Sequence, residues 1–318
     1  MSQETIVLII YTIAVIFGLL LFVILFFISF QNRKNKLLVK QIESEKRYER
    51  ELATSQLEIQ EQTFKNIGWE LHDNVGQLLS VLSIQLNMML LKNPDEIVIL
   101  PLFPHYAAAT TGSVFKEVTS CLSDKWVVPK ITFINQFYDN AKFIEAWLEK
   151  AREFDMSSYN KIIFSYHGVP NSHVDNVYPD SMCSDNDCET KITNDNKFCY
   201  KATVYETTKI LASKLGLEPN QYIVTFQSRL TNKWLSPFTD DVLQNLPKNG
   251  SKKVLVFSPA FTADCLETII EIGDEYKELF YEAGGDTLDY VPSLNYSDKW
   301  VDAIVDISNI NEDKDVQE

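Results

Sequence analysis

Residues 161–170 read KIIFSYHGVP, and this stretch decides the fold. Its first four residues form an apolar, β-branched run, which predicts a buried strand over residues 160–166. His167 follows directly at the end of that strand. The stretch therefore predicts one imidazole at the rim of a sheet.

Segments with the same character recur on both sides of this strand, and helical patterns separate them. The predicted strands are residues 97–100, 130–134, 221–227 and 253–258, and the predicted helices are residues 140–154 and 203–215. Strands that alternate with helices favour an α/β fold with a doubly wound parallel sheet. In such folds ligands bind at the carboxyl ends of the strands, which is where His167 lies.

Three carboxylates follow the run FTADCL (residues 261–266) at four-residue spacing: Glu267, Glu271 and Glu275. In a helix this spacing stacks the three side chains along one face. Like charges at this spacing repel each other and destabilise the helix. Such a row therefore indicates a site that handles cations or protons.

The composition excludes some classes of protein. The chain has 318 residues and a formal net charge of −15, so it is long enough for two domains and too acidic to favour a nucleic-acid partner. Three of its five cysteines lie close together in the sequence. Their number and spacing do not resemble a secreted disulfide framework, and they indicate cytosolic thiols or metal ligands.

Residues 5–30 are almost continuously apolar and carry no charge. At about 1.5 Å per residue, a helix of this length exceeds the roughly 30 Å hydrocarbon core of a bilayer. Basic residues follow the run at positions 33, 34, 36 and 40, which places everything after it in the cytoplasm by the positive-inside rule. We therefore predict a single-pass protein of the inner (cytoplasmic) membrane, with its catalytic part in the cytoplasm.

Residues 31–92 predict a cytoplasmic helical linker. Its loose apolar stripe is compatible with a coiled coil that joins two chains as a homodimer, and equally with a solvated helix. Within it, the run WELHDNVGQLLS (residues 69–80) resembles the phosphoacceptor box of sensor histidine kinases, with His72 as the nucleophile toward ATP. No kinase ATP-binding pattern follows. Pro94 breaks the helix instead, which indicates a seam between residues 89 and 96.

Beyond that seam, a series of motifs occurs in one order: PLFPHY (101–106), TTGS (110–113), SYHGVP (165–170), QSR (227–229), WL (234–235), PFTD (237–240), FTADCLET (261–268), GG (284–285) and YVPSLN (290–295). In order and spacing these motifs resemble the ferrochelatases, over about residues 96–304. That family has two similar α/β halves, and most of the first half would precede residue 96. The resemblance implies a truncated ferrochelatase-type sheet over residues 96–318, behind the membrane helix and the linker.

Ferrochelatases insert Fe²⁺ into a porphyrin and release two pyrrole protons. A neutral imidazole accepts protons near neutral pH, and oxygen or imidazole ligands hold a divalent cation less tightly than thiolates do. The resemblance implies these roles: His167 and Glu267 as catalytic groups, His167, Glu267, Glu271 and Glu275 as metal-handling groups, and Tyr166 and Trp234 against the porphyrin. His167 is either the proton acceptor or a metal ligand. His173 reads as a solvated loop residue, and His105 has no assigned role.

Cys183, Cys188 and Cys199 lie in an insertion-like stretch after His167. Some bacterial members of the family hold a [2Fe–2S] cluster with cysteines in such an internal segment, and four thiolates are the usual requirement. Only three are present here, which favours free thiols over a cluster.

Two functions follow from these readings. The first is a membrane-anchored ferrochelatase with Fe²⁺ and a porphyrin as substrates. The alternative is a membrane-bound signalling remnant of a sensor histidine kinase, phosphorylated in trans on His72.

Overall fold

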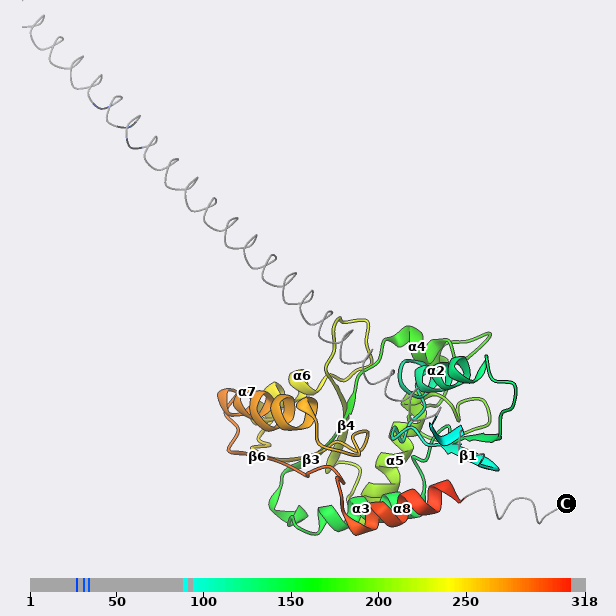
Figure 1. Ribbon diagram of the computed structural model, residues 1–318. Coiled ribbons are helices and arrows are strands. Elements are labelled where there is room, and N and C mark those ends of the chain that lie inside the picture. The colour runs from blue at the N-terminus through cyan, green and yellow to red at the C-terminus, as the bar shows by residue number, and fades with distance from the viewer. Residues whose placement is uncertain (1–26, 28–30, 32–33, 35–87, 91–93, 310–318) are drawn as a thin grey trace, which may run out of the picture. The chain divides into compact units, whose positions relative to one another are not determined.

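The structure is a computed structural model that describes residues 94–309, together with residues 27, 31, 34 and 88–90 (Figure 1). Among these residues no helix is both long and apolar enough to cross a membrane. The predicted membrane helix over residues 5–30 and the phosphoacceptor box with His72 lie outside the described residues. Contacts within the chain assign the described residues from 88 onward to one unit.

Six strands build two parallel sheets. They are β1 (Glu96–Ile99), β2 (Lys130–Phe133), β3 (Lys161–His167), β4 (Tyr222–Gln227), β5 (Lys253–Phe257) and β6 (Thr287–Tyr290). β1 and β2 form a parallel pair, and the other four strands form a parallel sheet in the order β4-β3-β5-β6. This arrangement confirms the predicted parallel α/β fold. All of these strands except β6 coincide with strands predicted from the sequence.

The strand order defines where a ligand can bind. From β3 the chain runs outward to β4, and it then returns across β3 to form β5 and β6 on the other side. The connections therefore diverge between β3 and β5. In parallel sheets such a switch point leaves a crevice at the carboxyl ends of the two strands. His167 is the last residue of β3, so it lies at this crevice.

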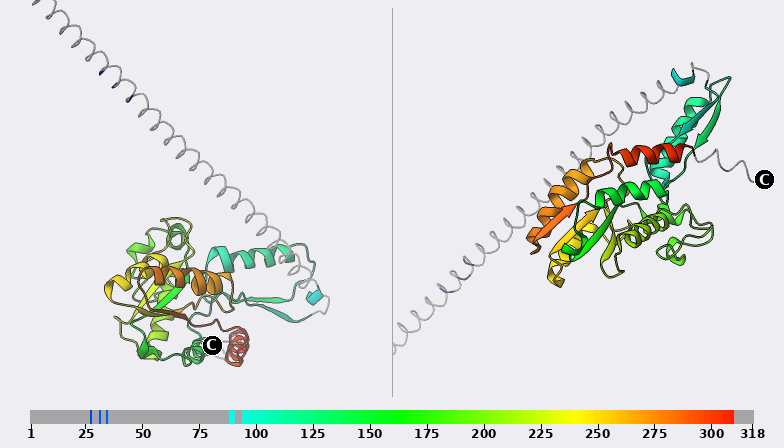
Figure 2. Two further views of the ribbon diagram at one scale, coloured as in Figure 1. Left: turned by 90° about the vertical axis from the view of Figure 1, so that its left-hand side faces the viewer. Right: turned by 90° about the horizontal axis from the view of Figure 1, so that it is seen from below.

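Both faces of the four-stranded sheet are covered by helices, as predicted for a doubly wound fold. On β3, Ile162 and Phe164 belong to one hydrophobic core and Ile163 belongs to the other, because successive side chains of a strand point to opposite faces. The first core includes side chains of α3 (Ala141–Ala151), α5 (Tyr200–Leu215) and α8 (Asp298–Ser308). Figures 1 and 2 both show α3 and α8 side by side.

The second core is formed by helices from the later part of the chain. They are α6 (Thr239–Asn245), the π-helix η5 (Glu267–Tyr276) and α7 (Lys277–Glu282). The remaining helical elements are η1 (Ala108–Gly112), α2 (Ser113–Leu122), η2 (Met156–Ser158), α4 (Asn171–Asp175), η3 (Cys183–Asp185) and η4 (Pro247–Asn249). The segment with the three spaced carboxylates is therefore helical, but as a π-helix, a rare form that occurs frequently at functional sites.

Residues 102–105, which follow β1, are joined by three hydrogen bonds to parts of the chain that pack around the four-stranded sheet. Phe137 N donates to Pro104 O at 2.9 Å, and Thr262 Oγ1 donates to Leu102 O at 3.2 Å. His105 Nε2 lies 2.9 Å from Thr207 Oγ1 on α5. These bonds hold residues 102–105 over the crevice at the carboxyl ends of β3 and β5.

Candidate active site

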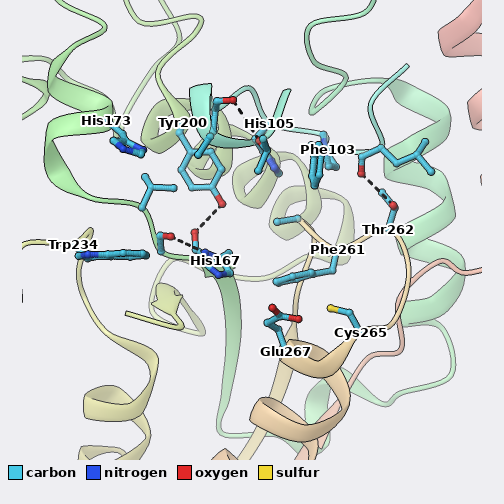
Figure 3. A pocket seen from close by; sticks show the side chains of 18 of the residues that line it. Phe103, His105, His167, His173, Tyr200, Trp234, Phe261, Thr262, Cys265 and Glu267 are labelled. Atoms are coloured by element: carbon cyan, nitrogen blue, oxygen red, sulfur yellow. Dashed lines mark hydrogen bonds between the residues drawn. The ribbon is translucent and has the colours of Figure 1, made fainter. Parts of the chain in front are cut away.

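A cavity of about 690 Å³ lies at these carboxyl ends. Its walls come from residues 102–110, from residues 167–173 after β3, and from residues 260–267 after β5, together with Tyr200 and Trp234 (Figure 3). Most of the lining is apolar or aromatic. A cavity of this size and character is typical of sites for small organic ligands.

His167 presents one imidazole nitrogen for chemistry. Its Nδ1 lies 2.7 Å from the carbonyl oxygen of Gly168, and because a carbonyl only accepts, Nδ1 carries the proton in this bond. The neutral ring then has its lone pair on Nε2. The backbone oxygen of His167 accepts a hydrogen bond from the Tyr200 hydroxyl at 2.9 Å, which holds the end of β3 in place.

Two aromatic side chains flank the imidazole. The ring centroids of Trp234 and Phe261 lie 6.3 Å and 6.4 Å from that of His167. Gly168 permits this packing, because a Cβ there would lie 3.2 Å from the Trp234 ring and 3.0 Å from Gln227 O. Trp234, predicted to contact a porphyrin, lines the cavity.

Glu267 is the first residue of η5, and its half-buried side chain lines the same cavity as His167. Figure 3 shows its carboxylate near Phe261 and Cys265, at the part of the cavity where the β5 loop enters η5. The structure therefore brings together the two groups predicted to be catalytic, although they are 100 positions apart in the sequence.

The other two carboxylates do not line the cavity. Glu271 accepts four hydrogen bonds: from Gln227 Nε2 at 3.0 Å, Ser228 N at 2.9 Å, Ser228 Oγ at 2.5 Å and Tyr276 Oη at 2.7 Å. Glu275 is exposed. The spacing of the three residues predicts one continuous row, but only Glu267 reaches the cavity, and Glu271 is occupied with the end of β4.

Tyr166, predicted to contact the porphyrin, does not line the cavity. Its side chain is fully buried in the core beneath the sheet, and its hydroxyl lies 2.8 Å from Thr208 Oγ1 on α5. Burial raises the pKa of this phenol. It does not line the cavity, because the residue next to His167 on a strand points to the opposite face. The tyrosine that does line the cavity is Tyr200.

Two histidines with no predicted role also line the cavity. His173 is exposed on α4. His105 is 2% exposed, and burial lowers the pKa of its imidazole to about 3, so the ring stays neutral. The Thr207 hydroxyl donates to Tyr138 O at 2.9 Å and therefore accepts from His105 Nε2, which leaves His105 Nδ1 as an unprotonated nitrogen without a partner. His105 lies in an irregular segment without hydrophobic periodicity, so the sequence carried no signal for its burial.

Away from the cavity, the three cysteines of the insertion-like stretch converge. Their sulfur atoms are separated by 3.5 Å (Cys183–Cys188), 3.6 Å (Cys183–Cys199) and 3.8 Å (Cys188–Cys199), and all three are buried. The two other cysteines of the chain, Cys121 and Cys265, do not belong to this group. A [2Fe–2S] cluster takes four protein ligands, so this set of three thiols does not fit one.

Comparisons with known proteins agree with the motif order. The ferrochelatase family model matches residues 81–311, so the match begins before the predicted seam at residues 89–96. A ferrochelatase of Legionella pneumophila is 36% identical over 236 residues, which are 74% of this chain and 70% of that protein. A ferrochelatase of Coxiella burnetii is 38% identical over 215 residues, 66% of this chain and 59% of that protein. Among solved structures, CbiX, the terminal enzyme of sirohaem biosynthesis in denitrifying bacteria, matches with a TM-score of 0.41 at 14% identity, covering 68% of this chain and 76% of that one.

Proposed function

This chain belongs to the ferrochelatase family, whose members insert Fe²⁺ into a porphyrin, and we propose how its own residues carry out that reaction. The observation that carries the proposal is that one apolar cavity holds both an imidazole with a free Nε2 and a carboxylate. The ferrochelatase function predicted from the motifs is confirmed by the family match. The residue roles that follow are our proposal.

The cavity binds the macrocycle through its aromatic walls. Phe103, Trp234 and Phe261 supply flat apolar surface, and burial of a porphyrin against them removes apolar area from water. Loss of that water also strengthens the electrostatic interactions of the few polar groups that face the ring.

His167 accepts a pyrrole proton at Nε2. The imidazolium that forms keeps its Nδ1–H bond to Gly168 O, and that bond becomes stronger because its donor is now charged.

Glu267 brings the metal. A single carboxylate binds Fe²⁺ weakly enough to release it to the four ring nitrogens, whereas a thiolate would retain it. When Fe²⁺ leaves for the ring, Glu267 becomes free to accept the second pyrrole proton, so that two protons leave as one divalent cation enters. In this scheme Glu271 is a positioning residue, and Glu275 contributes negative charge at the surface that attracts cations.

The test is insertion of Fe²⁺ or Zn²⁺ into protoporphyrin by the purified full chain, followed by absorbance. His167→Ala and Glu267→Ala should each lower the rate by about 100-fold or more, since each removes a group that acts on the reacting atoms. Glu278→Ala is the matched control, because it removes an exposed carboxylate of α7, the helix that follows η5, and should retain the rate. Wild-type turnover in either cavity variant, with unchanged circular dichroism, would overturn the assignment.

We also propose, from the apolar run and its basic flank alone, that residues 5–30 anchor the chain in the inner membrane with the catalytic part in the cytoplasm, and that residues 31–92 join two chains. Porphyrins are apolar, so an anchored enzyme would receive its substrate from the bilayer. Extraction of membranes with alkaline carbonate tests the anchor, and release of the chain into the supernatant would contradict it. The alternative function on His72 gains no support from the ferrochelatase matches.

A further inference from the structure

The three buried cysteines lie in the least regular part of the described chain. Between α4 and α5 the only regular element is the short turn η3, and the buried side chains of residues 176–199 are Tyr178, Cys183, Cys188, Asn196 and Cys199. The buried residues of this segment are therefore three cysteines, one tyrosine and one asparagine, with no fully buried aliphatic side chain. Segments with so little apolar surface to bury are commonly stabilised by a cross-link or a bound metal.

The spacing of the sulfur atoms is that of a tetrahedral metal site. Zn²⁺ lies about 2.3 Å from each thiolate sulfur, and tetrahedral angles at that distance separate the sulfurs by about 3.8 Å. The three separations in the structure are 3.5, 3.6 and 3.8 Å. We propose that Cys183, Cys188 and Cys199, here called the thiol triad, bind one tetrahedral divalent metal ion, with Zn²⁺ as the preferred ion.

The backbone holds each cysteine of the triad in place. Cys183 N donates to Asp175 Oδ1 at 2.9 Å, Cys188 N donates to Asn186 O at 2.7 Å, and Cys199 N donates to Asn196 O at 2.8 Å. These bonds fix the backbone at all three positions, which limits the further ordering that metal binding requires.

One of the three sulfurs lies at a helix N-terminus, where a thiolate, the form that binds metal, is stabilised. Cys199 is the N-cap of α5, a helix of 16 residues, and the positive end of the helix dipole stabilises an anionic sulfur there. The three thiols are within hydrogen-bonding distance of one another. Metal binding would replace these shared protons, so up to three protons are released for each ion bound.

Tyr178 completes the surroundings of the triad. Its hydroxyl lies 2.9 Å from Cys188 Sγ, and burial raises the pKa of the phenol, so it remains a neutral donor. A hydroxyl that donates to a ligand sulfur orients it, as the outer partners of metal ligands generally do. Tyr178 is therefore a positioning residue, and the fourth coordination position is left to water.

One residue, Tyr200, links the triad to the active-site cavity. Cys199 is followed by Tyr200, the first residue of α5, whose hydroxyl donates to His167 O. A metal on the triad would restrain the start of α5 and so the end of β3. The proposal itself concerns metal content and does not depend on the insertion reaction.

The experiment measures bound metal in the reduced full chain. After purification with Zn²⁺ and removal of free metal, elemental analysis should find about one Zn²⁺ per wild-type chain. Cys188→Ser should lose it, and Tyr178→Phe should bind with an affinity about ten- to 100-fold lower. Cys121→Ser is the matched control, a cysteine on α2 outside the triad, and it should retain the metal.

A spectroscopic measurement on the wild-type chain guards against variants that do not fold. Co²⁺ in place of Zn²⁺ should give sulfur-to-cobalt charge-transfer absorption and the visible bands of tetrahedral cobalt. A metal-free wild-type chain, whether its three thiols react freely or two of them form a disulfide, would overturn the proposal. So would two irons with acid-labile sulfide per chain, or loss of the metal in Cys121→Ser alone.

Discussion

Glu271→Gln is the substitution that best separates a structural carboxylate from a metal-transfer carboxylate. The wild-type side chain accepts two hydrogen bonds on each oxygen: Ser228 N and Tyr276 Oη donate to Oε1, and Gln227 Nε2 and Ser228 Oγ donate to Oε2. Ser228 has a φ of 59°, a left-handed conformation unusual for serine, and these bonds help to hold it. Gln has the same shape but only one acceptor oxygen.

Neither orientation of the new amide satisfies all four donors. With its NH₂ in the place of Oε2, it faces the NH₂ of Gln227. With its NH₂ in the place of Oε1, it faces the backbone N–H of Ser228, which cannot turn away. The hydroxyls of Ser228 and Tyr276 can rotate to accept, so one donor remains without an acceptor in either case. That donor costs about 1–3 kcal/mol, and the other bonds lose their charge assistance, so we expect a loss of about 2–3 kcal/mol in the free energy of unfolding.

Thermal unfolding of the full chain measures the change. For a unit of this size, the expected loss lowers the Tm by about 5–10 °C. Glu275→Gln, an exposed carboxylate one turn away, should change the free energy of unfolding by less than about 0.5 kcal/mol. If Glu271→Gln keeps the wild-type Tm and loses metal insertion, the structural role of Glu271 is refuted. The result would instead support the prediction that Glu271 handles metal together with Glu267 and Glu275.

Three further predictions concern the cavity. Tyr200→Phe removes the bond to His167 O and should lower the insertion rate about three- to tenfold, as measured by steady-state kinetics, whereas an unchanged rate would mean that the end of β3 needs no such restraint. Gly168→Ala places a Cβ 3.2 Å from the Trp234 ring, so it should raise the KM for porphyrin more than it lowers kcat, and an unaltered KM would contradict this packing. Burial lowers the pKa of His105 from 6.5 to about 3, so between these values the unfolded chain binds a proton that the folded chain does not, and stability is lost as the pH falls. Urea titrations should show a loss of about 1.4 kcal/mol per pH unit below about 6.5 that is absent in His105→Gln, and equal slopes in the two proteins would exclude His105 as the source.

The fold was predictable where the sequence carries a local signal for a strand or a helix, such as an apolar run or an N-cap residue. The apolar run that begins at Lys161 produced a strand whose residues 162–166 are buried. Asn140 is the N-cap of α3, and its side chain accepts hydrogen bonds from Lys142 N and Phe143 N at 3.0 Å each. β6 escaped prediction because it is only four residues long, and three of its four positions are partly exposed. The π-helical form of η5 has no signature in spacing alone, since i+4 repeats suit an α-helix equally well.

The site was predictable from motifs but not in its details. His167 and Trp234 both line the cavity although they are 67 positions apart in the sequence. Only the pattern of family motifs could predict that they lie in the same site. The position of Tyr166 in the core follows from strand alternation, which places it on the face opposite His167. For Glu271, the spacing determines which side chains share a helix face, but the direction of that face depends on how η5 packs against the sheet.

The described chain separates two kinds of metal chemistry by ligand type. In the cavity, an imidazole and a carboxylate suit an ion that must be released, and the thiol of Cys265 beside them has its pKa raised to about 11 by burial and by Glu267. That thiol therefore stays protonated near neutral pH and does not capture the passing cation. The thiol triad has the opposite character, because three buried sulfurs converge at one point beside the N-terminus of α5, and sulfur ligands suit an ion that stays bound. Chelation should follow the same division: a mild chelator should compete for Fe²⁺ in the insertion assay at concentrations that leave the metal of the triad in place. Loss of both at one chelator concentration would show that the two ligand sets hold metal equally, and would remove the distinction on which the roles of Glu267 and the triad rest.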